Sequence, residues 1–378
     1  MKSEWVQTDF NDCIDKVTYT KKVYRSDFLP IGKYPIISQE AEFINGYWDR
    51  NDDVYKTEVP VVIFGDHTQV LKYIDFDFVL GADGVKILKA KPFLYPKYLY
   101  YYMQSMQIKN LGYARHFRLL KEKKVTYPLS LSEQKRIVSK LDDIFKDAEK
   151  AKEIAEKNLQ NAKDLFESYL ENVFSNPGEG WNIEKLGNVC ELVNRGISPK
   201  YINENGLHVI NQRCIRNHYI DYSLARMHNE KVKKVSVDKY LRVGDVLINS
   251  TGVGTLGRVA QVKDLPFPAT VDSHVTIVRP FSDKFNHQFF EFVLIYLEKS
   301  FEKSGMGASG QIELSRDTIK NNFTVSYPQS ISTQTEIADK LRFLEDRVRT
   351  MVTIYKEKVS VVDELRKSVL NKAFSGEL

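Results

Sequence analysis

Cysteine is scarce in this chain of 378 residues, which has only three, at positions 13, 190 and 214. An odd number of widely separated cysteines excludes a disulfide framework and the paired spacing of a zinc knuckle. No apolar run approaches the roughly 20 residues that a membrane helix needs, and the longest clear run is 292–297. The first residues also lack the hydrophobic core of a signal peptide. Together these absences predict a protein of the reducing cytoplasm with no membrane partner.

Long tracts of glycine, proline or serine are also missing, although 28% of the residues are charged and 42% are hydrophobic. This composition excludes wholesale disorder and allows a chain of this length to bury about two or three cores. The net charge is +5 and the pI is about 8.7. A mildly basic chain is compatible with nucleic acid as a partner but does not by itself establish one.

What is present is an internal repeat at an offset of 200 residues. Between 125–175 and 325–375, the two copies are identical at 15 of 51 positions without a gap. The identities include Tyr127-Pro128 with Tyr327-Pro328, and Gln134 with Gln334. Unrelated segments of this length would share only about three identities. The chain is therefore built from two related halves.

Each copy of the repeat carries apolar or small residues at alternating spacings of four and three. This is the heptad pattern of a coiled-coil seam, and it is sustained for five heptads without glycine or proline. It predicts two helices, each about 60 Å long at 1.5 Å per residue, with Ser132 and Ser332 as N-cap residues. The predicted seam consists of Ile137, Leu141, Ala148, Ala155, Ala162 and Leu165 in the first copy and Ile337, Leu341, Val348, Tyr355, Val362 and Leu365 in the second.

The two seams are complementary in size. An antiparallel pairing centred on Ala155 and Tyr355 sets Ala148 against Val362 and Ala162 against Val348, so small residues face large ones. The alternative is that each helix packs only on its own globular domain. The seam is too narrow and too long for a globular face, which favours the paired coiled coil.

Globular segments precede each long helix, so the chain divides into 1–130, helix 131–175, 176–330 and helix 331–378. In the first segment, 59–64 and 78–80 predict strands and 98–106 predicts a helix; in the second, 245–248, 258–262 and 275–278 predict strands and 288–301 a helix. The predicted fold is α+β: two mixed α/β domains joined by two long antiparallel coiled-coil helices, with pseudo-twofold symmetry.

Gly252, Gly254 and Gly257 match the Gly-x-Gly-x-x-Gly pattern of dinucleotide-binding folds, and Asp272 follows at a suitable distance. That chemistry needs a helix opening at the third glycine, so that its N-terminus faces the pyrophosphate. Here the next residues alternate like a strand. The pattern therefore favours a glycine-rich hairpin loop, which is either a tight turn alone or a backbone that approaches a partner such as DNA.

Catalytic and metal-binding patterns are missing from the sequence. The seven histidines lack the spacing of a helical metal pair, and no nucleophile elbow, nuclease cluster or methyltransferase motif is present. We therefore expect a protein that is not an enzyme and binds no metal or cofactor of its own.

Polar residues cluster beside the predicted loops of both domains. Arginine, asparagine and glutamine can read base edges, and serine or threonine can contact base or phosphate. The alternative for any one of them is a solvated loop residue. The candidate DNA-binding residues are Asp66, His67, Thr68, Arg115, His116 and Arg118 in the first domain and Arg213, Arg216, Asn217, Ser250, Thr251, Thr255, Arg258, Ser309 and Gln311 in the second.

With these features, the chain resembles the specificity subunit of type I restriction–modification systems. The resemblance rests on 127–137 with its degenerate copy 327–337 and on the tail 370–378, and extends to 181–187, 243–247, 32–38 and 65–68. It covers the whole chain, and its helical motifs are more specific than those of the domains. One departure is Thr333, where the first copy has Glu133, and it affects only local capping.

The resemblance implies a non-catalytic subunit that binds double-stranded DNA. Each globular domain would be a target-recognition domain that reads half of a bipartite site, and the helices would set the spacing. Two methylation subunits would dock and bring S-adenosylmethionine, and a restriction subunit can join with ATP and Mg²⁺. A coiled-coil scaffold with protein-binding ends, and a nucleotide-using enzyme at the Gly252 loop, are the two rival hypotheses.

Overall fold

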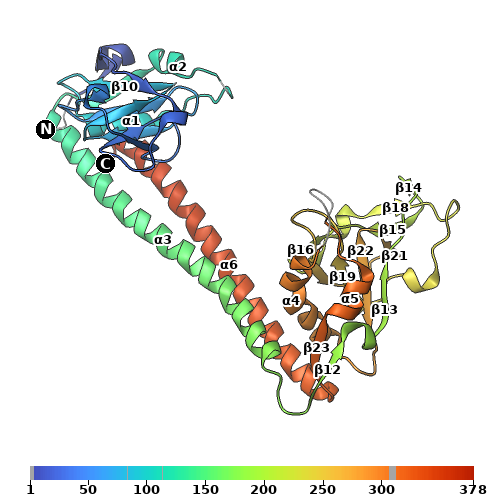
Figure 1. The fold of residues 1–378 in the computed structure, drawn as a ribbon. Helices are drawn as coiled ribbons and strands as arrows, with labels where there is room; N and C mark the ends of the chain where they lie inside the picture. Colours follow the sequence, from blue (N-terminus) through green and yellow to red (C-terminus); the bar gives the residue numbers. More distant parts are fainter. Residues whose placement is uncertain (1–3, 83, 113, 306–311) are drawn as a thin grey trace. The chain divides into compact units, whose positions relative to one another are not determined.

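The computed structural model describes residues 4–82, 84–112, 114–305 and 312–378 (Figure 1). The chain forms two compact units. The first contains Met1–Lys157 and Tyr355–Leu378, and the second contains Asn158–Ile354. Each long helix therefore begins in one unit and ends in the other. Within the described part of the chain, no helix combines the length and the apolar character that crossing a membrane requires.

Among the described residues, the first unit contains three β-sheets, two short α-helices and three 3-10 turns beside the long helices. A four-stranded sheet has the order β2 (Ile14–Asp15), β10 (Val85–Ala90), β7 (Val61–Gly65), β8 (Leu71–Ile74). A second has the order β3 (Lys22–Val23), β9 (Phe78–Gly81), β4 (Tyr34–Ile37), β5 (Gly46–Trp48), with β6 (Val54–Tyr55) also paired to β9. The remaining elements are β1 (Trp5–Asp9) paired with β11 (Lys124–Pro128), α1 (Pro96–Ser105) and α2 (Phe117–Lys121).

The second unit repeats the main four-stranded sheet and the closing pair of the first, whereas its other sheet has four strands in place of five. One sheet has the order β13 (Cys190–Arg195), β22 (Val275–Pro280), β19 (Val246–Asn249), β20 (Val259–Gln261), and another β14 (Tyr201–Ile202), β18 (Arg226–His228), β15 (Leu207–Ile210), β21 (Ala269–Val271). The other elements are the pair β12 (Trp181–Lys185) and β23 (Thr324–Pro328), the hairpin β16 (Ile215–Arg216) and β17 (Tyr219–Ile220), α4 (His287–Lys303) and α5 (Arg316–Asn322). The strands and helices predicted from the sequence are all present.

Two-stranded sheets close each globular domain at the start of its long helix. Trp5 lies opposite Pro128, and Trp181 lies opposite Pro328, so the first strand of each domain pairs with its last. The Tyr-Pro dipeptide of the repeat thus ends this closing strand. The chain then passes directly into α3 (Leu131–Ser175) or α6 (Ile331–Phe374).

The repeated glutamines Gln134 and Gln334 explain why this motif recurs. Both side chains are fully buried. Gln134 accepts from the backbone N–H of Tyr95 at 2.7 Å and donates to the carbonyls of Phe93 and Pro128 at 3.0 and 2.9 Å. Each glutamine thus fastens the first turn of a long helix to the start of α1 or α4 in its own unit.

Gln334 makes the same three bonds in the second unit. It accepts from Asn286 N at 2.9 Å and donates to the carbonyls of Lys284 and Pro328 at 2.9 and 2.8 Å. Replacing it with alanine would remove the side-chain partner of these three backbone groups and leave the Pro328 carbonyl buried without that bond, and a buried group that loses its partner costs about 1–3 kcal/mol. We expect Gln334→Ala to lower the free energy of unfolding by at least about 2 kcal/mol in urea titrations. The exposed Gln329→Ala is the control, and an equal loss there would contradict the role of the buried amide.

Each long helix begins one residue before the serine that was predicted to cap it. Because α3 starts at Leu131 and α6 at Ile331, Ser132 and Ser332 lie inside the first turn. Ser330 is the cap, since its hydroxyl accepts from the N–H of Thr333 at 3.3 Å. The predicted N-cap serines were therefore wrong by two residues, and the departure at Thr333 leaves capping intact.

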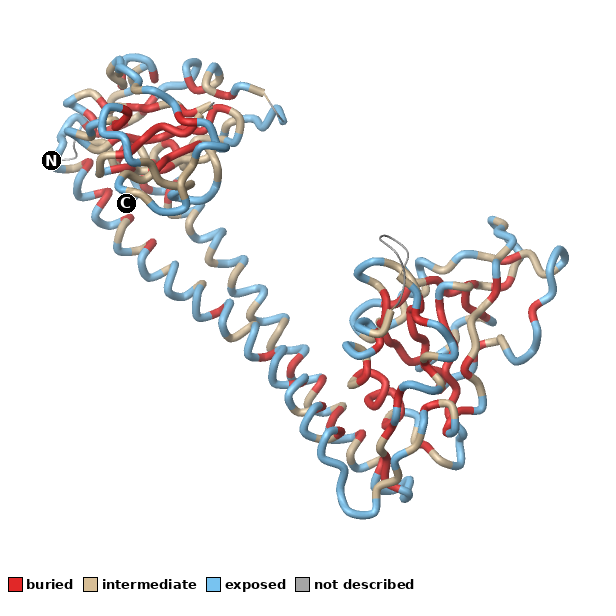
Figure 2. The backbone as a smooth tube through the Cα atoms, viewed as in Figure 1, coloured by how far each residue is buried: buried red, intermediate tan, exposed pale blue. Residues whose placement is uncertain are grey.

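Buried residues recur along one side of each long helix (Figure 2). In the first unit the start of α3 and the end of α6 share a core that contains Leu141, Phe145, Leu370 and Ala373. In the second unit the end of α3 and the start of α6 share another, with Phe166, Leu170, Leu341 and Val348 among its members. The two helices therefore run antiparallel in each unit.

Of the predicted seam residues, Ile137, Leu141, Ala155, Ala162, Leu341 and Val348 are buried, and Ala148, Ile337, Tyr355 and Val362 are half-buried. Leu165 and Leu365 differ, because they are 47% and 46% exposed. The seam moves to Phe166, which meets Phe292 of α4 edge-on at a ring distance of 6.2 Å. A straight helix drifts away from a strict heptad, and the end of α3 must also cover its globular domain.

Candidate nucleic-acid interface

Loops from separate parts of the first domain meet beside the β7–β8 hairpin. Asp66, the first residue after β7, is buried, and its carboxylate accepts from Phe117 N at 2.7 Å. The Asp66 backbone carbonyl accepts from His116 N at 2.7 Å and lies 3.0 Å from the His116 ring. Asp66 and the fully buried His116 therefore hold the hairpin loop against α2.

Other candidates of the first domain lie on the outside of this arrangement. Thr68, Arg115 and Arg118 are exposed, and His67 is half-buried. Since Asp66 and His116 use their polar atoms inside the protein, they position the loop, whereas the two arginines and Thr68 can reach a partner. The sequence pattern named all six residues, in two separate segments, but predicted neither that the segments meet nor that their roles differ.

In the second domain the glycine-rich loop connects β19 to β20. Gly252, Gly254 and Gly257 have φ values of +100°, +71° and +85°, which only glycine adopts without strain. A strand, β20, follows the third glycine in place of a helix. The loop is therefore a hairpin connection, and the dinucleotide geometry is absent from it.

Four candidates belong to this loop, and they differ in access. Ser250 is buried and pairs with Thr276 Oγ1 at 2.5 Å, so it supports the sheet. Thr251, Thr255 and Arg258 are half-buried, and Arg258 donates through Nη2 to the Gly254 carbonyl at 2.7 Å. The arginine therefore holds the tip of the loop in place.

A cavity of about 440 Å³ opens next to this loop. Of its residues, only Arg213 is among the DNA-binding candidates predicted from the sequence. The lining residues are Tyr201, Asn211, Gln212, Arg213, Leu224, Arg226, Asp272 and His274. They come from β14, the turn after β15, the short 3-10 helix Tyr222–Leu224, β18 and the turn after β21, so tertiary structure alone brings them together.

The walls of this cavity carry both stacking and hydrogen-bonding groups. The Arg226 guanidinium lies 3.4 Å from the centre of the Tyr201 ring, and His274 Nδ1 lies 2.8 Å from the Thr251 hydroxyl. Burial raises the pKa of the Asp272 carboxyl, and the backbone N–H and ring of His274 oppose that shift. Stacked arginine, imidazole and carboxyl groups are suited to recognising a base edge or its sugar–phosphate.

The remaining candidates lie on the turn that contains β16 and β17. Arg213, Arg216 and Asn217 are exposed, and Asn217 has a φ of +49°. Ser309 and Gln311 lie outside the described residues.

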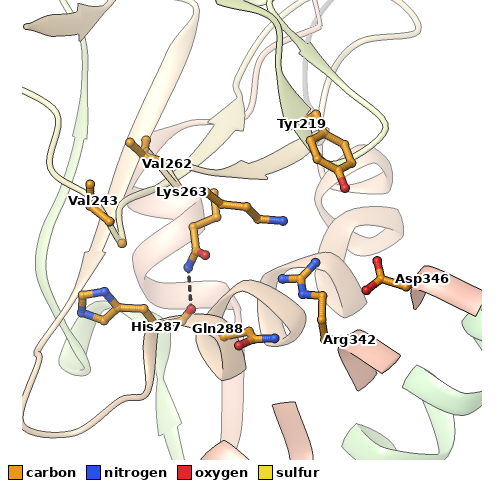
Figure 3. A pocket seen from close by; sticks show the side chains of 10 residues that line it. Tyr219, Val243, Val262, Lys263, His287, Gln288, Arg342 and Asp346 are labelled. Carbon is orange, nitrogen blue, oxygen red and sulfur yellow. Dashed lines mark hydrogen bonds between the residues drawn. The ribbon is translucent and has the colours of Figure 1, made fainter. Parts of the chain in front are cut away.

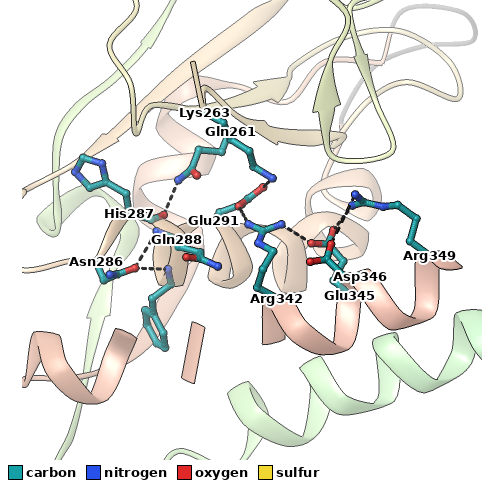
Figure 4. A network of polar contacts seen from close by, with 11 residues as sticks. Gln261, Lys263, Asn286, His287, Gln288, Glu291, Arg342, Glu345, Asp346 and Arg349 are labelled. Atoms are coloured by element: carbon teal, nitrogen blue, oxygen red, sulfur yellow. Dashed lines mark hydrogen bonds and ion pairs between the residues drawn. The ribbon is translucent and has the colours of Figure 1, made fainter. Parts of the chain in front are cut away.

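A second cavity in this unit, of about 400 Å³, is lined by residues of α4, α6 and β17, by the turn before β19 and by the end of β20 with the residues after it (Figure 3). A network of ion pairs lies at its wall (Figure 4). Glu291 of α4 is fully buried and pairs with Arg342 of α6 and with Lys263 at 3.0 Å. Burial lowers the pKa of the Arg342 guanidinium, but Glu291 and Glu345 raise it by more. These ion pairs attach α6 to α4, so we assign the network a structural role.

Within the described part of the chain, no three His, Cys, Asp or Glu side chains gather closely enough to hold a metal ion. The three thiols are buried, and burial raises their pKa values, that of Cys13 to about 11. They are therefore protonated at neutral pH and poor nucleophiles.

Comparison with known proteins identifies a family that matches this chain. The model described as the type I restriction modification DNA specificity domain matches residues 2–157 and 178–357. A type I restriction enzyme specificity subunit of Escherichia coli is 29% identical over 89 residues, which is 22% of this chain and 22% of that protein.

Two solved structures resemble the fold. A chain from a study of complex assembly and conformational transition of the type I R-M system has a TM-score of 0.76 at 17% identity, covering 100% of both chains. The HsdS subunit of Thermoanaerobacter tengcongensis has a TM-score of 0.57 at 18% identity, covering 99% of this chain and 97% of that one.

Proposed function

The chain belongs to the family of type I restriction modification DNA specificity domains, and we propose that its two globular domains each read one half of a bipartite DNA site. The family match carries this proposal, because it falls once on each half of the chain. A member of this family is a sequence-specific DNA-recognition subunit and is not itself catalytic.

Exposed or half-buried basic and polar side chains beside the loops of both domains support the proposal. In the first domain they are His67, Thr68, Arg115 and Arg118. In the second they are Arg213, Arg216, Asn217, Thr251, Thr255 and Arg258, with the cavity that holds Tyr201, Arg226 and His274. Asp66, His116 and Ser250 are left out as direct contacts because they are buried.

The antiparallel long helices would set the distance between the half-sites. We expect them also to dock two methylation subunits that carry S-adenosylmethionine, and a restriction subunit that uses ATP and Mg²⁺ can join the complex. The repeat of helix and domain supports two equivalent docking positions. We expect this assembly to act in the cytoplasm.

Binding of random duplex DNA tests the proposal against a protein-binding scaffold. If the chain neutralises about four phosphates, its affinity should fall roughly a hundredfold between about 50 and 200 mM salt. The measurement is a fluorescence anisotropy titration at several salt concentrations. Addition of methylation subunits and S-adenosylmethionine should yield methylated DNA, whereas the chain alone should yield none. No DNA binding at low salt would favour the scaffold, and methyl transfer by the chain alone would contradict a purely recognising role.

Arg258→Ala should relax recognition in the half-site of the second domain only. The arginine lies beside the glycine loop and also braces it, so both a lost contact and a released loop would act there. A good base contact contributes about 1–3 kcal/mol. The control is Arg242→Ala, since that exposed residue pairs with Glu191 away from the loop. Gln311→Ala is expected to act on the same half-site. The methylated DNA sequences in cells that carry each variant report the outcome. If Arg258→Ala and Gln311→Ala both leave the recognised sequence unchanged, these residues do not read the half-site.

A further inference from the structure

One glutamine occupies the same topological position in both domains. Strand β4 runs parallel to β9 with Ile37 opposite Leu80, and β15 runs parallel to β21 with Ile210 opposite Val271. The residue two positions beyond each isoleucine is Gln39 in one domain and Gln212 in the other. These glutamines are 173 positions apart, so the repeat at an offset of 200 does not reveal their equivalence.

In the first domain the hairpin loop after β7 holds Gln39 at both of its carbonyl oxygens. The backbone N–H of His67 donates to Oε1 at 3.1 Å, and the Thr68 hydroxyl donates to the Gln39 backbone carbonyl at 2.5 Å. Gly84 has a φ of +75°, and a Cβ there would lie 2.3 Å from Oε1. The amide is therefore confined between two loops.

In the second domain the last residue of β19 and the loop after it contact the same two oxygens of Gln212, through different donors. Asn249 Nδ2 donates to the Gln212 backbone carbonyl at 3.1 Å, and the Thr251 hydroxyl donates to Oε1 at 3.4 Å. Here the neighbouring glycine is Gly252, whose φ is +100° and whose Cβ would lie 2.9 Å from Oε1. Strands β7 and β19 occupy the same place in the two topologies, so equivalent strands place the donors of both sites, whereas the neighbouring glycine belongs to the β9–β10 connection in the first domain and to the β19–β20 loop in the second.

The consequence is an amide whose oxygen is engaged and whose amino group is available. Both glutamines are half-buried, and toward the described residues neither Nε2 donates a hydrogen bond. In the second domain Gln212 also lines the cavity that contains Arg226 and His274. Each amide therefore presents a donor that a bound partner can use.

We propose that Gln39 and Gln212 are equivalent base-reading residues, one in each domain, that donate through Nε2 to an acceptor on a major-groove base edge. This inference rests on the proposed function. Because Oε1 is held by the loop, each glutamine acts as a donor and not as a bidentate partner of adenine. A donor suits guanine O6 or N7, thymine O4 or adenine N7, and it rejects the amino group of cytosine.

The test exchanges the donor for an acceptor with almost no change in shape. Gln39→Glu and Gln212→Glu keep an oxygen for the loop and replace the amino group with an oxygen. Each variant, assembled with methylation subunits, selects from a library of randomised duplexes, and selected sequences are read. We expect each to lose preference at one position of one half-site, by about tenfold or with a change toward cytosine, and the two variants to act on different halves.

Neutral substitutions separate this effect from charge repulsion by the phosphates. Gln39→Met and Gln212→Met should weaken the same single positions without favouring cytosine. Gln7→Glu and Gln329→Glu are the matched controls, since both are exposed glutamines at the closing two-stranded sheets and should leave the selected sequence unchanged. Melting temperatures should stay close to that of the parent chain.

Two outcomes distinguish this inference from the function on which it rests. If the parent complex selects no sequence, the proposed function fails. If the parent complex selects a bipartite site, and all four variants select the same bases with the same preference or weaken every position equally, the inference is overturned and the function stands.

Discussion

Insertion of one heptad into each long helix should lengthen the spacer between the half-sites by roughly three base pairs, or abolish binding. Seven residues add about 10 Å at 1.5 Å per residue, and duplex DNA rises about 3.4 Å per base pair. Near Asn158 and Lys358 the insertion preserves the seven-residue seam. These sites also lie close to the places along α3 and α6 where one compact unit passes to the other.

The DNA would also turn by about a third of a revolution over three base pairs, so both domains must still meet a groove. The expected result is therefore either a longer spacer between the same two half-sequences or loss of methylation. Long-read sequencing of methylated genomic DNA measures the spacer. An insertion of four residues in α3 alone is the control, because it breaks the heptad register and should destabilise the coil.

An unchanged spacer with intact binding would contradict the idea of the helices as a ruler. In that case α3 and α6 would serve mainly to dock partner subunits. The half-sequences themselves should not change in any version of the experiment, since neither globular domain is altered.

Arg342→Ala should destabilise the second unit by about 3–5 kcal/mol. The substitution removes the main partner of Glu291, whose side chain has no exposed surface. Removing one member of a buried ion pair leaves an uncompensated charge, which costs about this much. Lys263 remains 3.0 Å from Glu291, which places the expected effect toward the lower end.

Arg349→Ala is the matched control on the same helix. Arg349 is 44% exposed at its side chain and pairs with Glu345 and Asp346, so its loss should cost about 1 kcal/mol or less. The second unit has one tryptophan, Trp181, and the first has two, at positions 5 and 48. Urea unfolding followed by fluorescence in a Trp5→Phe, Trp48→Phe background reports on the second unit alone.

A double replacement separates charge compensation from packing. Glu291→Leu with Arg342→Met exchanges the pair for apolar groups and should recover most of the lost stability. If Arg342→Ala and Arg349→Ala cost the same, or the double replacement is as unstable as Arg342→Ala, then Glu291 does not depend on Arg342 as the contacts indicate.

The candidate site was only partly predictable. Proximity in sequence identified the loops at 66–68, 115–118 and 250–258, because polar residues follow recognisable strands there. It did not separate Arg115, which is exposed, from the adjacent His116, which is buried and bonded to Asp66. Gln39, Gln212 and Arg226 carried no signal, because the strands that position them pair with partners distant in the chain.

Local periodicity determined the helices, the two-fold repeat and the order of domain and helix. A heptad seam can be recognised from the spacing of residues within one segment, and comparison of the two segments shows that small residues in one match large residues in the other. Even there, tertiary packing decided the end of the seam. Leu165 and Leu365 continue the heptad in sequence, but Phe166 enters the core, since the end of α3 must meet α4 as well as α6. The same holds for the polar groups: residue type shows that Gln134, Gln39 and Arg342 can hydrogen-bond. Only the fold decides that Gln134 is buried and bonded to the backbone, that Gln39 keeps a donor available for a base, and that Arg342 neutralises a buried carboxylate. These roles depend on contacts between residues far apart in the chain.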